Sequence, residues 1–142
     1  MEISILKNFS EYPGLRHCKI SDKSGEEFYH SVLNDKFYEV FSKNEKLIVD
    51  LDNTGGYASS FLDEAFGNLV FDFTLDKVKN KIEIISIQEP HWKDMILDKT
   101  FKEWENRRLQ KINPVVTIIH KPWYRLVENK LIKDVWESPV VV

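Results

Sequence analysis

A short apolar run that leads into a pair of glycines constrains the fold of this chain more than any other stretch. Leu47-Ile48-Val49 is rich in β-branched residues and ends at Asp50, a pattern typical of a strand buried on both faces. Gly55-Gly56 follows, and paired glycines permit backbone angles that other residues avoid. We therefore expect a buried strand that ends in a tight turn.

A helix is predicted directly after this turn. Ser59 or Ser60 is expected to cap it through a hydroxyl oxygen. Asp63 and Glu64 follow in the first turn, where carboxylates suit the helix dipole. The apolar residues at helical spacing form one face, made of Phe61, Leu62, Ala65, Phe66 and Leu69. Strand, turn and helix together predict an α/β unit.

Further strands and helices are predicted on both sides of this unit. Strands are expected at 3–6, 15–20, 81–88 and 115–119, and helices from Glu26 to about 42, from Pro90 to about 111 and over 124–135. Ser21 or Ser24 is expected to cap the first helix, a kink is expected near Asp98, and 74–80 is expected to be a connection. This alternation predicts an α/β fold with a mixed, partly parallel sheet of about four to five strands packed with about three to four helices.

Composition limits the class of protein. With 142 residues and 42% hydrophobic content, the chain can bury one core, so we expect a single domain over 1–142. Twenty basic and 23 acidic residues nearly balance, which does not suggest a nucleic-acid tail or a membrane-surface helix. The lone Cys18 excludes an internal disulfide and cysteine-rich zinc modules. Without a signal peptide or an apolar span, a cytoplasmic protein is expected.

The segment IVDLDNTGGYASSFLDEAFGNL resembles the core of a bacterial STAS-like family of unknown function, related to the STAS domains of anti-sigma-factor antagonists. The matching positions are Val49-Asp50-Leu51, Gly55-Gly56-Tyr57 and Ser60-Phe61-Leu62-Asp63-Glu64. Ser24-Gly25-Glu26-Glu27-Phe28 occupies the place where these proteins begin their first helix. The resemblance covers about residues 14–110. It implies a STAS-like core over 1–111 and leaves 112–142 as a C-terminal strand and aromatic extension.

The resemblance also implies a function. STAS antagonists are regulatory protein-interaction modules, and a partner kinase of the GHKL ATPase type phosphorylates a serine at the start of the helix after the central strand. That serine corresponds to Ser59, with Ser60 next to it; this chain has Ala58-Ser59-Ser60-Phe61 where antagonists usually have Asp-Ser-x-Gly. The implied partner surface comprises Asp52, Asn53, Thr54, Gly55, Gly56, Tyr57, Ser59, Ser60, Asp63 and Glu64.

Catalytic and metal-binding alternatives are less well supported by the residues. Asp50, Asp52 and the pair at 63–64 offer oxygen ligands for a divalent cation, but strand-end and helix-start roles explain them better. The serines lack a Gly-x-Ser-x-Gly elbow. The four histidines, His17, His30, His91 and His120, share no ligand spacing. We predict no catalytic residue, no metal site and no cofactor, and the alternative is a small hydrolase or ligand-binding domain that uses the turn from Gly55 to Glu64.

Aromatic residues gather in the C-terminal extension. Trp123-Tyr124 and Trp136 could form a patch, and aromatic residues are enriched at interface cores. A homodimer through this segment is therefore a prediction. Basic residues are also frequent here, but acidic residues such as Glu128 and Asp134 lie between them, so a nucleic-acid surface is not expected.

Overall fold

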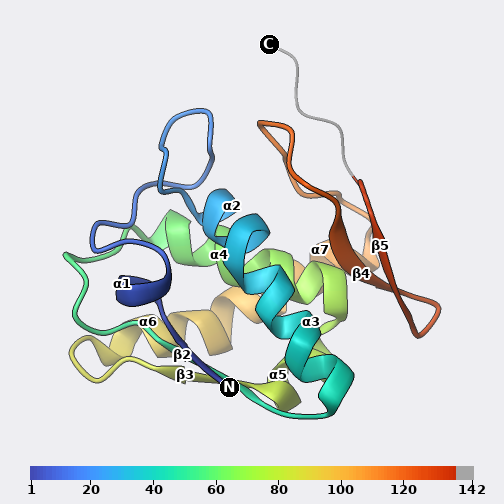
Figure 1. Ribbon diagram of the computed structural model, residues 1–142, viewed down its shortest axis with the longest axis horizontal. Coiled ribbons are helices and arrows are strands. Elements are labelled where there is room, and N and C mark those ends of the chain that lie inside the picture. Colours follow the sequence, from blue (N-terminus) through green and yellow to red (C-terminus); the bar gives the residue numbers. More distant parts are fainter. Residues whose placement is uncertain (137–142) are drawn as a thin grey trace.

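A parallel three-stranded sheet lies at one side of the molecule in the computed structural model, which describes residues 1–136. Its strands are β1 (Glu2–Ser4), β2 (Leu47–Asp50) and β3 (Ile82–Ile85), and β2 lies between the other two (Figure 1). Ile3 pairs with Val49, and Val49 pairs with Ile84. The predicted α/β class with a partly parallel sheet is confirmed. The end of the predicted C-terminal extension, 137–142, lies outside the described residues.

The sheet buries mainly one of its faces. Leu47 and Val49 on β2 have no exposed surface, whereas the intervening Ile48 and Asp50 are half-buried. On β3 the same alternation leaves Glu83 exposed. The prediction that β2 is buried on both faces is therefore wrong. A helix layer over one face suffices to bury the alternate residues, and the charged residues on the other face keep it in contact with water.

Helices form most of the molecule. The helices that precede the turn are α1 (Ile5–Asn8), α2 (Gly25–Phe28), the π-helical turn η1 (Tyr29–Leu33) and α3 (Asn34–Lys43). Those that follow it are α4 (Ser59–Phe73), α5 (Leu75–Lys81), α6 (Pro90–Met95), the π-helical turn η2 (Ile96–Thr100) and α7 (Phe101–Leu109). The predicted helix from Glu26 is confirmed, and Ser24 caps it by accepting a bond from the Glu27 amide at 3.0 Å. The predicted kink near Asp98 is η2, which keeps both Ile96 and Phe101 buried.

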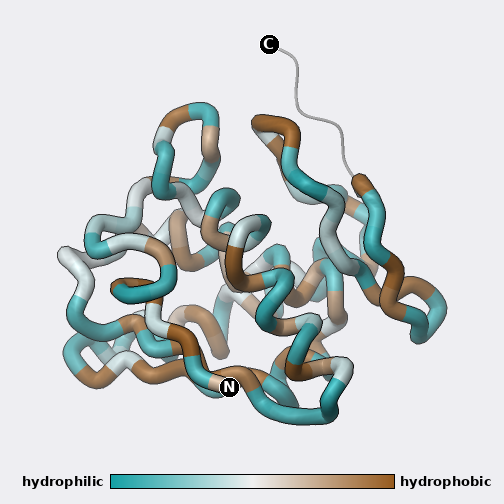
Figure 2. Tube along the Cα trace, in the orientation of Figure 1, coloured by the Kyte–Doolittle hydropathy of each residue, from teal (hydrophilic) through white to brown (hydrophobic). Residues whose placement is uncertain are grey.

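Helix α4 crosses the centre of the molecule (Figure 1). The predicted face is confirmed, because all five of its apolar residues are buried. The opposite side is buried too, including Glu64, Asn68 and Asp72. Figure 2 shows that apolar segments run along the strands of the parallel sheet, whereas polar residues line much of the outer loops. The core therefore surrounds α4 rather than lying under one of its faces.

Four local predictions are wrong. Residues 15–20 form turns rather than a strand, 75–81 is the helix α5 rather than a connection, and 115–119 has no strand partner. Residues 124–135 form a hairpin of β4 (Trp123–Val127) and β5 (Lys130–Asp134) instead of a helix. Its two-residue turn places Glu128 and Asn129 at φ of 50° and 65°, which is the left-handed geometry that hairpin turns require.

The hairpin packs against the helices, as Figure 1 shows at one edge of the molecule. Asn34 fixes it, because its side chain accepts from the Tyr124 amide at 2.9 Å and donates to the Tyr124 carbonyl at 3.0 Å. Tyr124 stacks on Tyr38 with ring centroids 3.6 Å apart, and Trp123 is buried. Tyr124 and Trp123 thus make contacts within the chain rather than forming an exposed aromatic patch. The homodimer stays a prediction. Among residues 1–136, the structure contains no helix with the length and apolar character that crossing a bilayer requires.

Candidate functional site

The turn after β2 is fixed to the loop after β3. Because these strands are parallel, their carboxyl ends meet at the same edge of the sheet. The Asp52 carboxylate accepts from the amides of Ile87 at 3.1 Å and Gln88 at 3.0 Å. The Gln88 side chain in turn accepts from the Asn53 amide at 2.8 Å and donates to the Asn53 side chain at 2.9 Å. Asp52 and Asn53 therefore hold the turn in place.

A cavity of about 250 Å³ opens at this edge. Tyr57 closes one side, and its hydroxyl donates to the Leu51 carbonyl at 2.6 Å. Gly56 adopts a φ of +118°, which a residue with a Cβ rarely takes. The cavity is lined by residues of the turn and of the loop after β3, namely Leu51, Asp52, Thr54, Gly55, Gly56, Tyr57, Ser86, Gln88, Glu89 and Trp92. The structure thus brings most of the predicted turn residues to one concave surface.

The two serines lie at the start of α4, but neither caps it. Ala58 is the capping residue, and no side chain bonds the first amides of the helix within residues 1–136. The prediction that Ser59 or Ser60 caps α4 is therefore wrong, because the helix begins at Ser59 and both serines lie inside it. Ser59 is exposed and Ser60 is half-buried. The hydroxyl of Ser59 is consequently accessible at a helix start that has no side-chain cap.

Ser59 lines a second, smaller cavity of about 150 Å³. Two cationic side chains, Arg16 and Lys99, share this cavity, and its other lining residues are Asp63, Met95, Thr100 and Glu103. Arg16 Nη1 bonds Asp63 Oδ2 at 2.8 Å and Glu64 Oε1 at 3.1 Å. The guanidinium therefore lies next to the helix start and is already neutralised by two carboxylates.

Glu64 belongs to the core rather than to the surface. It is 2% exposed, and the Asn68 side chain donates to its Oε2 at 2.7 Å. Burial raises the pKa of Glu64 above its ordinary value, although the nearby His17, Asn68 and Arg16 act in the opposite direction. Asp63 and Glu64 lie in the second turn of α4 rather than in the predicted first turn, and the side chain of Glu64 faces inward. Its place in a partner surface stays a prediction.

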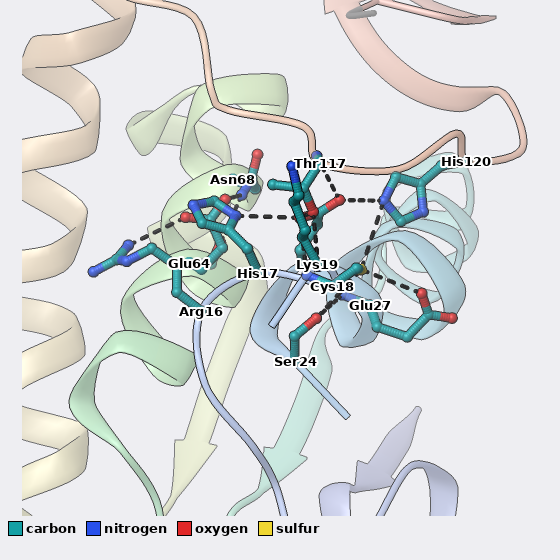
Figure 3. A network of polar contacts seen from close by, with 11 residues as sticks. Arg16, His17, Cys18, Lys19, Ser24, Glu27, Glu64, Asn68, Thr117 and His120 are labelled. Atoms are coloured by element: carbon teal, nitrogen blue, oxygen red, sulfur yellow. Dashed lines mark hydrogen bonds and ion pairs between the residues drawn. The ribbon is translucent and has the colours of Figure 1, made fainter. Parts of the chain in front are cut away.

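Figure 3 shows a polar network, not revealed by the sequence, in which side chains such as Cys18, Thr117 and His120 meet. Glu26 lies at the centre of its bonds. Glu26 is fully buried on α2. Its Oε1 accepts from Thr117 Oγ1 at 2.7 Å and from the Cys18 amide at 3.2 Å, and its Oε2 lies 2.6 Å from His120 Nε2. Burial opposes ionisation, but the bonds from His120, Thr117 and the Cys18 amide hold the pKa of Glu26 well below its ordinary value. Glu26 is thus a buried carboxylate with a full set of donors.

The carboxylates that the sequence offered as cation ligands do not converge on one point. Within residues 1–136, Cys18, Glu26 and His120 are the one set of three or more histidine, cysteine or carboxylate groups whose ligand atoms converge. Asp50 instead bonds the Asp52 amide at 2.9 Å. Asp63 pairs with Arg16, and Asp52 accepts from amides of the loop after β3. The carboxylates considered for a cation therefore serve turns and ion pairs.

This architecture is that of an α/β domain whose central parallel strand leads through a glycine turn into a serine-bearing helix. Residues 24–92 match the family model described as a STAS-like domain of unknown function (DUF4325), which confirms the family expected from the sequence. The match runs from the cap of α2 into α6 and includes β2, the turn, α4 and β3. No curated protein and no solved structure matches the chain. Residues 24–92 thus match a STAS-like domain, and such a match suggests a regulatory module.

Proposed function

We propose that this protein is a non-catalytic regulatory module that binds a protein partner through the turn after β2 and the start of α4. The contact surface comprises the accessible residues of the predicted set, from Asp52 to Ser60, with Asp63 at its border. By resemblance to STAS antagonists, the partner is a GHKL-type ATPase that phosphorylates Ser59. The observation that carries the proposal is Ser59 itself, exposed at the start of a 15-residue helix with no side-chain cap.

Electrostatics supports Ser59 as a switch. A phosphate adds about 1.5 to 2 negative charges and three acceptor oxygens. At Ser59 it would lie at the positive end of α4 and in the cavity that contains Arg16 and Lys99. It would also compete with Asp63 for Arg16. Phosphorylation would therefore change both the charge of the surface and the ion pair that joins the 11–24 loop to α4.

A hydrolase is less well supported by the same surroundings. Nucleophilic catalysis by a serine requires a base in contact with it. The cavity that contains Ser59 is lined, among the described residues, by two cations, two carboxylates, a threonine and a methionine, without a histidine. A ligand-binding role for the larger cavity is also weaker, because about 250 Å³ falls below the range of roughly 300–1,000 Å³ usual for small-molecule sites.

The experiment compares partner capture by the tagged protein and its Ser59→Ala and Ser59→Asp variants from lysate of the source cells, with and without ATP. We expect one ATPase to bind the unmodified protein and Ser59→Ala, and to be lost from Ser59→Asp. With ATP, mass spectrometry should find phosphate on Ser59. Ser42→Asp is the matched control, since Ser42 is exposed at the far end of α3. Equal capture by Ser59→Asp and Ser59→Ala would exclude the switch.

A further inference from the structure

Three ligand atoms of different chemistry converge beside α2. Cys18 Sγ lies 4.0 Å from His120 Nε2, and His120 Nε2 lies 2.6 Å from Glu26 Oε2. All three ligand atoms are within 4.8 Å of one another. The residues come from three separate parts of the chain: the 11–24 loop, the first turn of α2 and the segment between α7 and β4. Such a convergence of thiol, imidazole and carboxylate is not a consequence of local sequence.

Neighbouring groups orient each of the three. Ser24 Oγ donates to Cys18 Sγ at 3.3 Å, and Thr117 and His17 bond the Glu26 carboxylate. The His120 ring stacks on the buried His30, with centroids 4.0 Å apart. Bonds of this kind to the groups behind the ligands are what fixes ligand direction in metal sites. The three side chains are thus held facing one another.

We propose that Cys18, Glu26 and His120 bind a Zn²⁺ ion. Thiolate, imidazole and carboxylate together are a ligand set that zinc accepts, whereas Mg²⁺ and Ca²⁺ take oxygen ligands. Three protein ligands leave the fourth tetrahedral position for water or for Glu27, whose Oε2 lies 3.6 Å from Cys18 Sγ. A cavity of about 250 Å³ lined by Glu27, His30 and His120 gives access from the solvent.

The distances are compatible with such an ion after small rotations. Zinc bonds of about 2.3 Å to sulfur and about 2.0–2.1 Å to nitrogen and oxygen place sulfur and nitrogen about 3.6 Å apart, and nitrogen and oxygen about 3.3 Å apart. The observed pairs are 4.0 Å and 2.6 Å apart. The ring must therefore move away from the carboxylate by about 0.7 Å and towards the sulfur by about 0.4 Å.

The competing interpretation is a hydrogen-bonded network without a metal. In that case the bonds of Glu26 alone would hold the segment at 117–120 in place. The Cys18 sulfur would only accept a hydrogen bond from Ser24. The two interpretations differ in what they require of the sulfur. A metal site needs a thiolate bond, whereas the network does not.

The test uses the untagged chain of 142 residues, treated with chelator and then titrated with Co²⁺ and Zn²⁺. We expect one Co²⁺ per chain with a thiolate-to-cobalt charge-transfer absorption, displaced by one Zn²⁺. Cys18→Ser should abolish this absorption and weaken Zn²⁺ binding at least about tenfold. His120→Ala should weaken binding similarly. His91→Ala is the matched control, because His91 is exposed on α6 and should bind as the unmodified chain does.

Folding is controlled separately, because Glu26 also supports the fold. Circular dichroism without metal should be the same for Cys18→Ser and the unmodified chain, since serine keeps the size of the side chain. Zn²⁺ should raise the melting temperature of the unmodified chain but not that of Cys18→Ser. If a folded, unmodified chain binds no Co²⁺ or Zn²⁺, or if Cys18→Ser leaves affinity and spectrum unchanged, the proposal is overturned. Neither result bears on the partner surface at Ser59.

Discussion

Tyr57 shows how a single hydroxyl defines the candidate surface. Its bond to the Leu51 carbonyl closes the turn over the end of β2. Burial, together with the negative charges of Asp50 and Asp52, raises the pKa of Tyr57 from 10.0 to about 12. The neutral phenol is therefore the form that the folded chain keeps.

This shift predicts a dependence of stability on alkaline pH. Unfolded Tyr57 loses its proton near pH 10 and the folded residue near pH 12, so its contribution is complete below pH 10 and is lost as pH rises towards 12. Tyr57→Phe should remove this part of the decline in the free energy of unfolding, measured by urea titration across that range. It should also lower stability at neutral pH by about 1 kcal/mol through the lost hydrogen bond. Tyr12→Phe is the control, because Tyr12 is 71% exposed.

The Cys18 thiol is a second residue whose protonation is set by its surroundings. Burial and the neighbouring carboxylates raise the pKa of the Cys18 thiol to about 12, so the free thiol is a poor nucleophile at neutral pH. This argues against a Cys18–His120 catalytic pair. A bound metal ion would instead replace the thiol proton.

At the scale of elements, the contact between α4 and α7 depends on Gly67. A Cβ built on Gly67 would lie 2.1 Å from the Trp104 indole. Trp104 is 1% exposed and donates to Asp63 at 3.2 Å. The indole is therefore held in place, and the glycine is needed because the two helices approach closely, not because of a backbone angle.

Gly67→Ala should consequently destabilise the protein, although alanine is the better helix former by about 1 kcal/mol. The steric conflict with Trp104 should outweigh that gain and lower the free energy of unfolding by about 1–3 kcal/mol. A double-mutant cycle with Trp104→Phe measures the coupling by urea unfolding. The loss caused by Gly67→Ala should be smaller in the Trp104→Phe background. Equal losses in both backgrounds would show that the conflict lies elsewhere.

At the scale of the whole molecule, a buried ion pair joins the C-terminal hairpin to α4. Arg125 Nε lies 2.6 Å from Asp72 Oδ1, and Asp72 is 1% exposed. The Tyr29 hydroxyl also donates to Asp72, and Asn34 donates to that hydroxyl at 3.0 Å. One network thus links η1, α3, α4 and β4.

Arg125→Met should therefore destabilise the protein strongly. It keeps most of the side-chain volume but leaves Asp72 buried without the guanidinium, and breaking such a pair costs about 3–5 kcal/mol. Thermal or urea unfolding measures the loss. Lys130→Met on β5 is the matched control, because Lys130 is exposed on the same hairpin, and it should change stability by less than about 0.5 kcal/mol. A similar effect of the two variants would mean that the pair with Asp72 contributes little.

The sequence by itself determined the elements that carry a strong local pattern. The β-branched run of β2, the apolar period of α4 and the serine cap at Ser24 depend on neighbours within a few residues. The same local pattern supported the STAS-like family, and it placed the turn from Asp52 to Tyr57 correctly at the end of β2. The apolar period also predicted that α4 is buried, but not that its polar side chains are buried too.

Only the tertiary structure decided the rest, because the deciding contacts join residues far apart in the chain. The segment at 124–135 forms a hairpin rather than the predicted helix, because Asn34 bonds the backbone of Tyr124 and Asp72 bonds the side chain of Arg125. Likewise, 115–119 has β propensity but no strand beside it, and Thr117 bonds Glu26 instead. His120 follows Cys18 by 102 positions, so no spacing rule could pair them. Local periodicity reports which face of an element is apolar, whereas the partners of buried polar groups are set by how the elements pack.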